Sequence, residues 1–280
     1  MKIGVTGATG QLGKLVVEQL KKKVAVENIV ALVRTPDKAS DLGIEVRAFD
    51  YNKPNEMVGA LNGIDHLLLI SANEIGKRTE QHKNVIEAAQ KADVQWIVYT
   101  SLLHADTSSL NLAGEHRFTE EALKGSGIDY TILRNGWYTE NYTGSIQGAL
   151  KAGAFVASAG DGKISSATRT DYAEAAAVAI TDQSHNGMTY ELAGDTAYSL
   201  SELAAEISKQ SGKQIPYKNL PEAEYAGILK NMGVSEQFAN AIASWDISAS
   251  KGDLFNDSKQ LSKLIGRPTT PLSATVKSSL

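Results

Sequence analysis

The sequence contains no cysteine among its 280 residues. That absence excludes disulfide bonds, thiolate catalysis and cysteine-ligated metal sites. An excess of basic residues is also missing, because 28 lysines and arginines stand against 32 aspartates and glutamates and give a net charge of −4. Proteins whose main partner is a nucleic acid usually carry a basic field, so we expect no nucleic-acid partner.

Long apolar runs are missing too. Runs such as Leu67–Ile70 fall far below the roughly 20 residues that a helix needs to cross a bilayer, so we expect no membrane span. The first ten residues carry one lysine and a strand-like stretch that runs into glycines, without the longer apolar region of a secretory signal. We therefore expect a cytoplasmic protein.

What is present is the composition of an ordinary globular chain. Hydrophobic residues make up 42% of the sequence and charged residues 21%, which excludes an intrinsically disordered protein. At roughly 150 residues per domain, the length suggests one large domain with a smaller partner.

Short apolar runs alternate with helical patterns through the first half of the chain. Their spacing of roughly 20 to 30 residues fits crossover helices between parallel strands and not hairpins. The runs at 29–33 and 66–70 are apolar without alternation, as in parallel strands that are covered on both faces. The predicted strands are Lys2–Thr6, Asn28–Val33, Glu45–Phe49, His66–Ile70, Trp96–Thr100 and Tyr130–Leu133.

Helices are predicted between these strands and in the second half. They are Gln11–Lys23, one that begins at Thr35-Pro36, Arg78–Lys91, Thr170–Thr181, and Ser199–Gln210 with the capping-box pair Ser199 and Glu202. Residues 221–265 look mostly helical, with breaks at Gly233 and Gly252, and Thr189–Leu192 is a further strand. The segment 267–272 looks like a loop.

This order predicts an α/β fold, a Rossmann-type doubly wound parallel sheet with a smaller, mainly helical C-terminal lobe. We expect residues 1–135, plus roughly 165–193, to form the Rossmann domain. Residues 136–164 and 194–280 would then form the substrate-side lobe.

The strongest motif is a glycine loop with the spacing G-x-x-G-x-x-G. Gly7, Gly10 and Gly13 follow the first predicted strand and open the first helix, which is the context of a dinucleotide-binding fingerprint. Glycines permit a tight turn, a close approach of the backbone to a pyrophosphate and close packing of helix on strand, while the helix N-terminus faces the phosphates. A glycine-rich turn without a ligand is the alternative, and the placement favours cofactor binding.

The end of the second strand indicates which cofactor is preferred. A preference for NAD would normally show as an acidic residue there, holding the ribose 2′-hydroxyl, but this strand ends in Arg34. An arginine can hold a 2′-phosphate through charge-assisted hydrogen bonds, and Lys38 could assist. Arg34 as a solvated loop residue is the alternative. Because no acid stands at the end of this strand, we favour NADPH.

Asp50 ends the third predicted strand and has two interpretations. Its carboxylate could accept a hydrogen bond from an adenine amino group. Equally, Asp50 or Asn52 could cap the helix that begins near Pro54.

The tyrosine–lysine pair of many reductases of this fold is absent. None of the ten tyrosines has a lysine four residues on, so the usual proton donor to a carbonyl is missing. His116 and Glu120 could form a general acid pair, but we favour a surface interaction one helical turn apart. The five histidines show no metal-ligand spacing and no nucleophile elbow occurs, so we predict no metal site.

Seven segments together resemble the NmrA-like branch of the atypical short-chain dehydrogenases/reductases. Within it, the similarity is to the bacterial type 2 NAD(P)H:quinone oxidoreductases, with the triphenylmethane reductases as a sister group. It runs over essentially the whole chain. The segments are TGATGQLG, ALVRTPDKA, YTSLLHADTS, YTILRNGWYTENY, SATRTDYAEAAA, ELAGD and SKLIGRPTTPL.

The resemblance implies NADPH as cofactor and direct hydride transfer to a small planar quinone, without flavin or metal. The residues that it places at the cofactor are Gly7, Ala8, Thr9, Gly10, Gln11 and Leu12 on the pyrophosphate, Arg34 on the 2′-phosphate, Ser71, Ala72, Asn73 and Glu74 along the cofactor, Trp137, Tyr138, Thr139, Glu140, Asn141 and Tyr142 around the nicotinamide and substrate, and Arg169 as a support. Family members vary in their catalytic acid, and this sequence identifies none.

Our leading hypothesis is therefore an NADPH-preferring quinone reductase. A quinone accepts a hydride readily and its oxygen can take a proton from water, so the site needs mainly proximity and a flat apolar slot. Trp137, Tyr138 and Tyr142 could form that slot, or they could be core aromatics. A dinucleotide-sensing regulator without turnover is the second hypothesis, and a reductase of dyes is the third. The sequence leaves the oligomeric state open, a homo-oligomer included, as it does the physiological quinone.

Overall fold

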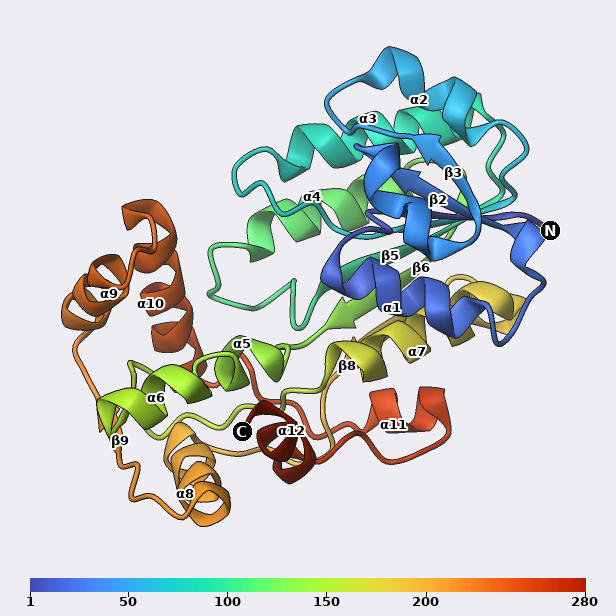
Figure 1. The fold of residues 1–280 in the computed structure, drawn as a ribbon. Helices are drawn as coiled ribbons and strands as arrows, with labels where there is room; N and C mark the ends of the chain where they lie inside the picture. Colours follow the sequence, from blue (N-terminus) through green and yellow to red (C-terminus); the bar gives the residue numbers. More distant parts are fainter.

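A seven-stranded sheet, parallel throughout, forms the centre of the molecule, for which a computed structural model describes residues 1–280 (Figure 1). The strand order is β3-β2-β1-β4-β5-β6-β8. The strands are β1 Ile3–Thr6, β2 Ile29–Val33, β3 Glu45–Ala48, β4 His66–Leu69, β5 Trp96–Leu102, β6 Asp129–Asn135 and β8 Thr189–Leu192. All seven strands that the sequence predicted are confirmed, with ends shifted by at most two residues.

The order reverses at β1, which lies between β2 and β4. Connections that leave β1 and β4 therefore diverge at their carboxyl ends and open a crevice there, the place where doubly wound sheets bind ligands. The predicted Rossmann-type fold is confirmed.

One face of the sheet is covered by α1 (Gln11–Leu20) and α7 (Arg169–Thr181), which pack side by side (Figure 1). Every second residue of β2, namely Ile29, Ala31 and Val33, points into this layer. Alanines dominate α7 and let it lie close to both α1 and the sheet. The short helix α11 (Gln260–Ile265) completes the layer through Leu261.

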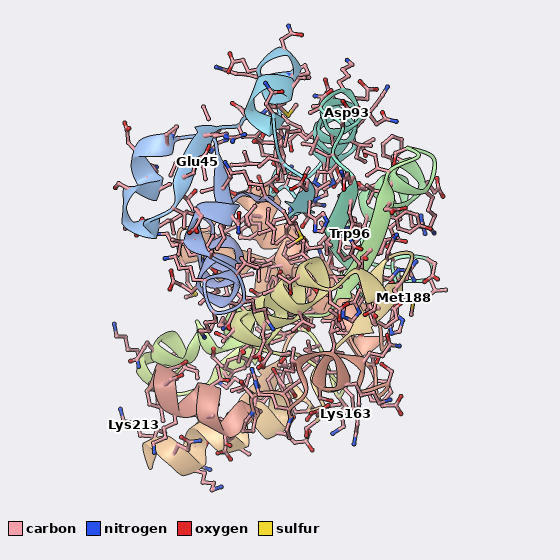
Figure 2. The ribbon with its side chains drawn as sticks, turned by 90° about the vertical axis from the view of Figure 1, so that its right-hand side faces the viewer. Glu45, Asp93, Trp96, Lys163, Met188 and Lys213 are labelled. Carbon is pink, nitrogen blue, oxygen red and sulfur yellow. The ribbon has the colours of Figure 1, made fainter.

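The other face is covered by α2 (Pro54–Leu61), α3 (Arg78–Lys91) and α4 (Ala113–Lys124). The alternate residues Val30 and Leu32 of β2 point into this second layer. Both faces of the central strands are thus buried, which explains why their sequences are apolar without alternation. Figure 2 shows these layers after a quarter turn, with Trp96 in the interior of the sheet.

A second core lies beside the carboxyl end of the sheet. It is formed by a two-stranded parallel sheet and six helices, which occupy the lower left of Figure 1. These elements are β7 Phe155–Ala157, β9 Tyr217–Asn219, α5 Glu140–Thr143, α6 Ile146–Ala152, α8 Leu200–Ser211, α9 Glu222–Asn231, α10 Glu236–Ser250 and α12 Leu272–Ser279. None of the helices in the structure is both long and apolar enough to cross a membrane.

The predicted helices are confirmed with differences at their ends. The first helix ends at Leu20 and not Lys23, and the capping box of Ser199 with Glu202 is present in α8. The helix after Thr35 is a 3₁₀ helix, Pro36–Leu42, and the Thr35 side chain does not cap it. The sequence missed β7, β9, α5, α6 and α12. The two-domain division stays a proposal. Within the part assigned to the lobe, residues 194–280, α11 packs on α7 of the sheet domain.

Asp171, in the first turn of α7, ties the C-terminal segment to the sheet domain. Its side chain is fully buried and accepts hydrogen bonds from Thr168 Oγ1 at 2.9 Å, Thr270 N at 3.0 Å and Arg267 Nη2 at 2.8 Å. A buried carboxylate with this many donors is stabilising as long as every partner is kept.

We expect Asp171→Ala to lower the free energy of unfolding by about 3–5 kcal/mol, because it leaves buried donors without an acceptor. Urea unfolding followed by circular dichroism measures this loss. The control is Asp257→Ala, which removes an exposed carboxylate near the same segment and should change stability by less than about 0.5 kcal/mol. Equal losses in both variants would contradict the anchoring role.

Candidate functional site

The glycine loop turns sharply between β1 and α1. Gly7 has φ +59°, a left-handed conformation that favours glycine, and its carbonyl accepts a hydrogen bond from Gly10 N at 2.8 Å. A Cβ on Gly13 would lie 2.2 Å from the Gly7 oxygen, so only glycine lets α1 start this close to the strand. Gly10 is extended, with φ −73° and ψ 169°.

The start of α1 faces the cleft with free donors. Gly10 is its N-cap and offers no side chain, and the first N–H that bonds back to it is Lys14 N, at 3.0 Å from Gly10 O. The N–H groups of Gln11 and Leu12 therefore have no acceptor in the helix. Together with the helix dipole they form an anion-binding site, so the loop fits a dinucleotide pyrophosphate.

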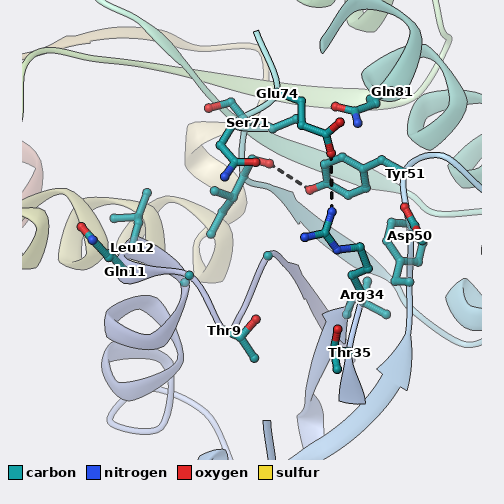
Figure 3. A pocket seen from close by; sticks show the side chains of 18 of the residues that line it. Thr9, Gln11, Leu12, Arg34, Thr35, Asp50, Tyr51, Ser71, Glu74 and Gln81 are labelled. Carbon is teal, nitrogen blue, oxygen red and sulfur yellow. Dashed lines mark hydrogen bonds and ion pairs between the residues drawn. The ribbon is translucent and has the colours of Figure 1, made fainter. Parts of the chain in front are cut away.

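A cleft of about 730 Å³ opens at the carboxyl ends of β1, β2, β3 and β4 (Figure 3). It brings together most of the residues that the sequence and the resemblance proposed. Those that line it are Gly7, Thr9, Gly10, Gln11, Leu12, Arg34, Asp50, Ser71, Ala72, Asn73, Glu74, Tyr138 and Arg169. Ala8 lies fully buried beneath the loop.

Arg34 extends into this cleft from the end of β2, with 69% of its side chain exposed. Lys38 lines the same side. The end of β2 carries no acid, but the fold brings one beside Arg34 from another loop. Glu74 Oε1, from the loop between β4 and α3, lies 3.5 Å from Arg34 Nη1 (Figure 3).

Asp50 does not cap a helix, so that alternative is wrong. The residue before α2 is Lys53, and no side chain caps this helix. Asp50 Oδ1 instead accepts a hydrogen bond from Asn52 N at 3.0 Å and holds the turn that leads out of β3. Its carboxylate lines the cleft, where the hydrogen bond to an adenine amino group stays a proposal.

The 71–74 loop is fixed to the elements behind it. Ser71 N donates to Thr100 Oγ1 at 2.9 Å, and Ala72 N donates to His82 Nε2 at 2.9 Å. His82 then carries its proton on Nδ1 and donates to Thr119 Oγ1 at 2.9 Å. Burial and the nearby Arg78 hold the pKa of His82 well below its usual value, so the ring stays neutral and keeps this acceptor.

Tyr138 and Arg169 form the wall of the cleft on the lobe side. The Arg169 guanidinium lies 4.4 Å from the centre of the Tyr138 ring, in a cation–π contact. Glu140 Oε1 accepts from Arg169 N at 2.9 Å, and Asn141 Oδ1 accepts from Arg169 Nη2 at 2.8 Å. Glu140 and Asn141 thus do not line the cleft, but they orient the arginine that does.

The remaining residues of the 137–142 segment do not line this cleft. Thr139 is buried against Ser166, with their hydroxyl oxygens 2.8 Å apart. Tyr142 is buried in the second core and donates to Asp246 Oδ1 at 3.2 Å. Trp137 is half-buried and packs edge-to-face on Trp245, with ring centroids 5.6 Å apart.

The prediction of a surface pair of His116 and Glu120 is wrong, because both side chains are buried. His116 Nδ1 lies 2.7 Å from the Tyr99 hydroxyl, and burial lowers the pKa of His116 to about 3. The Glu120 carboxylate accepts from Arg134 Nη2 at 2.8 Å and from Ser101 Oγ at 2.6 Å. Neither residue lines the cleft, so they do not form a general acid pair there.

Sequence reasoning missed several residues of the cleft, among them Tyr51, Asn52, Arg78 and Gln81. Tyr51 and Asn52 follow Asp50 beyond β3, and the rule that placed Asp50 at this edge would have found them. The Tyr51 hydroxyl lies 2.9 Å from Ile70 O and joins the loops beyond β3 and β4 (Figure 3). Arg78 and Gln81 belong to the first turn of α3, for which the sequence carried no signal.

Fold and loop together define a dinucleotide-binding Rossmann protein. A cradle without Cβ atoms, free helix N–H groups and cations at one edge of a parallel sheet match a dinucleotide phosphate. A family model described as NAD(P)H-binding matches residues 7–183, and the chain belongs to this family, in its NmrA-like branch.

Relatives extend the similarity to nearly the whole chain. Quinone oxidoreductase 2 of Escherichia coli (strain K12) is 56% identical over 277 residues, 98% of this chain and 97% of that protein. A crystal structure of the NADPH-dependent E. coli enzyme with NADPH has a TM-score of 0.96 and covers 99% of both chains. Citrobacter sp. triphenylmethane reductase with NADP(H) is 40% identical, with a TM-score of 0.96 over 100% of both chains. The resemblance drawn from the sequence is confirmed.

We expect Gly10→Val to fold but to lose NADPH binding by more than about 100-fold, as judged by NADPH fluorescence. The extended backbone of Gly10 accepts a branched residue, and an added Cβ would meet only the Gly7 oxygen, at 3.1 Å. Its methyl groups would then stand in front of the free N–H groups of α1. Gly59→Val, at a helical position with open space around it, is the control. A folded Gly10→Val protein with normal affinity would contradict the site.

Proposed function

We propose that the protein is an NADPH-dependent quinone oxidoreductase that transfers a hydride directly to a quinone, without flavin. One observation carries this proposal: a dinucleotide cleft with an arginine at the end of β2, in a chain 56% identical to E. coli quinone oxidoreductase 2. In the cleft, Gln11 and Leu12 hold the pyrophosphate, Arg34 the 2′-phosphate, and Asp50 the adenine.

The chemistry that a bound NADPH supplies is donation of a hydride from its nicotinamide ring. The residues on the lobe side hold that end of the cleft in place. Tyr138 backs the cleft with its aromatic face, and Arg169 is fixed over it by Glu140 and Asn141. Because these contacts are made within the chain, the wall is ordered before the ligand arrives.

The acceptor lies on the same side, against an aromatic row that begins next to Tyr138. Trp137 packs on Trp245 of α10, and Phe238, 48% exposed, packs on Trp245 with ring centroids 5.8 Å apart. Flat, partly exposed aromatic side chains suit a planar conjugated acceptor. The similarity to a triphenylmethane reductase points to the same shape of substrate.

Water supplies the proton to the reduced quinone. Burial raises the pKa of Tyr138, so this phenol at the cleft holds its proton at neutral pH. His116 is neutral and buried outside the cleft. A quinone becomes a stable hydroquinone without a strong enzyme acid, so positioning is the main contribution of the site.

Oxidation of NADPH followed at 340 nm, with and without 1,4-benzoquinone, tests the function. We expect turnover only with the quinone, formation of one hydroquinone per NADPH, no flavin absorbance near 450 nm and no stimulation by added FMN. Crystal violet in place of the quinone tests the dye-reductase alternative. Tight NADPH binding without turnover on either acceptor would instead favour the regulatory function.

We expect Arg34→Ala to weaken NADPH about tenfold or more and NADH by less than about threefold. Only NADPH carries the 2′-phosphate, and one charge-assisted hydrogen bond is worth about 1.5–3 kcal/mol. Fluorescence titration gives both dissociation constants. Arg117→Ala, which removes an exposed charge on α4, is the control. Equal losses for the two cofactors would show that Arg34 contacts a group that they share.

A further inference from the structure

Glu74 places a carboxylate at the point where the cofactor's extra phosphate would meet Arg34. Its Oε1 is 3.5 Å from Arg34 Nη1, and its Oε2 is 3.2 Å from Lys77 Nζ. Both Arg34 and Glu74 line the cleft, from loops that follow different strands (Figure 3). Hydrogen bonding to Lys77 lowers the pKa of Glu74, so it is ionised at neutral pH.

The contact between Glu74 and Arg34 is one that a ligand can displace. The arginine side chain is 69% exposed and that of Glu74 is 31% exposed, and exposed ion pairs of this kind are weak. A 2′-phosphate that binds Arg34 must take the place of this carboxylate while remaining close to it. The two anions repel each other, and this repulsion opposes the attraction of the arginine.

For a ribose 2′-hydroxyl the same carboxylate has the opposite effect. An acidic side chain is the group with which Rossmann proteins commonly accept a hydrogen bond from that hydroxyl. In the dinucleotide fingerprint this acid stands at the end of the second strand. Here the carboxylate comes instead from the loop after β4. Lys77 Nζ lies 3.2 Å from its second oxygen, so Glu74 still has a cation beside it when Arg34 turns to a phosphate.

We propose that Glu74 is a specificity-determining residue that lowers the preference for NADPH over NADH and keeps NADH as an alternative cofactor. The inference rests on the proposed function only in that both dinucleotides bind in this cleft. Arg34 and Glu74 then act in opposition: the arginine favours the phosphorylated cofactor and the carboxylate reduces that advantage.

Glu74→Gln tests the proposal, because it removes the charge and keeps the shape. Dissociation constants for NADPH and NADH are measured by fluorescence titration at low salt, after a thermal melt has shown that the variant is folded. We expect NADPH to bind about three- to tenfold tighter and NADH to bind equally or up to about threefold more weakly. The dissociation constant for NADH divided by that for NADPH therefore rises.

Glu80→Gln is the matched control. Glu80 is an exposed glutamate in the first turn of α3 that does not line the cleft, so its loss should leave the ratio unchanged. A ratio within twofold of wild type for Glu74→Gln overturns the inference. Even then, the proposed function stands as long as the wild-type protein reduces quinone with NADPH. Failure of the wild-type protein to bind NADPH overturns both.

Discussion

The contact between the first turn of α1 and the carbonyl of Gly7 is the constraint on which the site depends. An added Cβ at Gly13 would lie 2.2 Å from that oxygen and 2.7 Å from Ala8 Cα. The helix can therefore approach β1 closely, and its free N–H groups open directly onto the crevice where the strand order reverses. The alanine-rich α7 packs beside α1 and brings Arg169, its first residue, to the same crevice. The position of α1 therefore places its free N–H groups on one side of the cleft and, through the packing of α7, Arg169 on the other.

Two cations in the cleft differ in how firmly the chain holds them. Arg169 is fixed before any ligand binds, by a stacking contact and by hydrogen bonds with Glu140 and Asn141. Arg34 is largely exposed, and its one ion-pair partner, Glu74, lies 3.5 Å away in a partly exposed contact. In the proposed function, fixed geometry suits the end of the cleft where hydride transfer requires alignment, and an exchangeable partner suits the end where we propose that two cofactors are discriminated.

The sheet was predictable because its sequence signal is local and strong. Central strands buried on both faces read as continuous apolar runs, and the spacing between them requires crossovers. Site residues were predictable where they follow a predicted strand, as Arg34 does after β2 and Asp50 does beyond the edge strand β3. The pairing of β7 with β9 was not predictable, because Phe155 and Tyr217 are 62 positions apart in the sequence and their strands have only three residues each. Glu74 beside Arg34 was missed for the same reason, since the two are 40 residues apart.

The wrong prediction of a surface pair for His116 and Glu120 also bears on the mechanism. Polar residues one turn apart on a helix look like a solvated face, but their partners come from the sheet: Tyr99 and Ser101 of β5 and Arg134 of β6. Glu120 thereby fixes Arg134 near the end of β6, three residues before the aromatic pair of Trp137 and Tyr138 begins. In reductases of this fold that use a tyrosine–lysine pair, this helix supplies the proton donor. Here His116 and Glu120 of this helix instead hydrogen-bond to side chains of β5 and β6. This arrangement fits the proposed function, in which the site orients its ligands and the acceptor takes its proton from water.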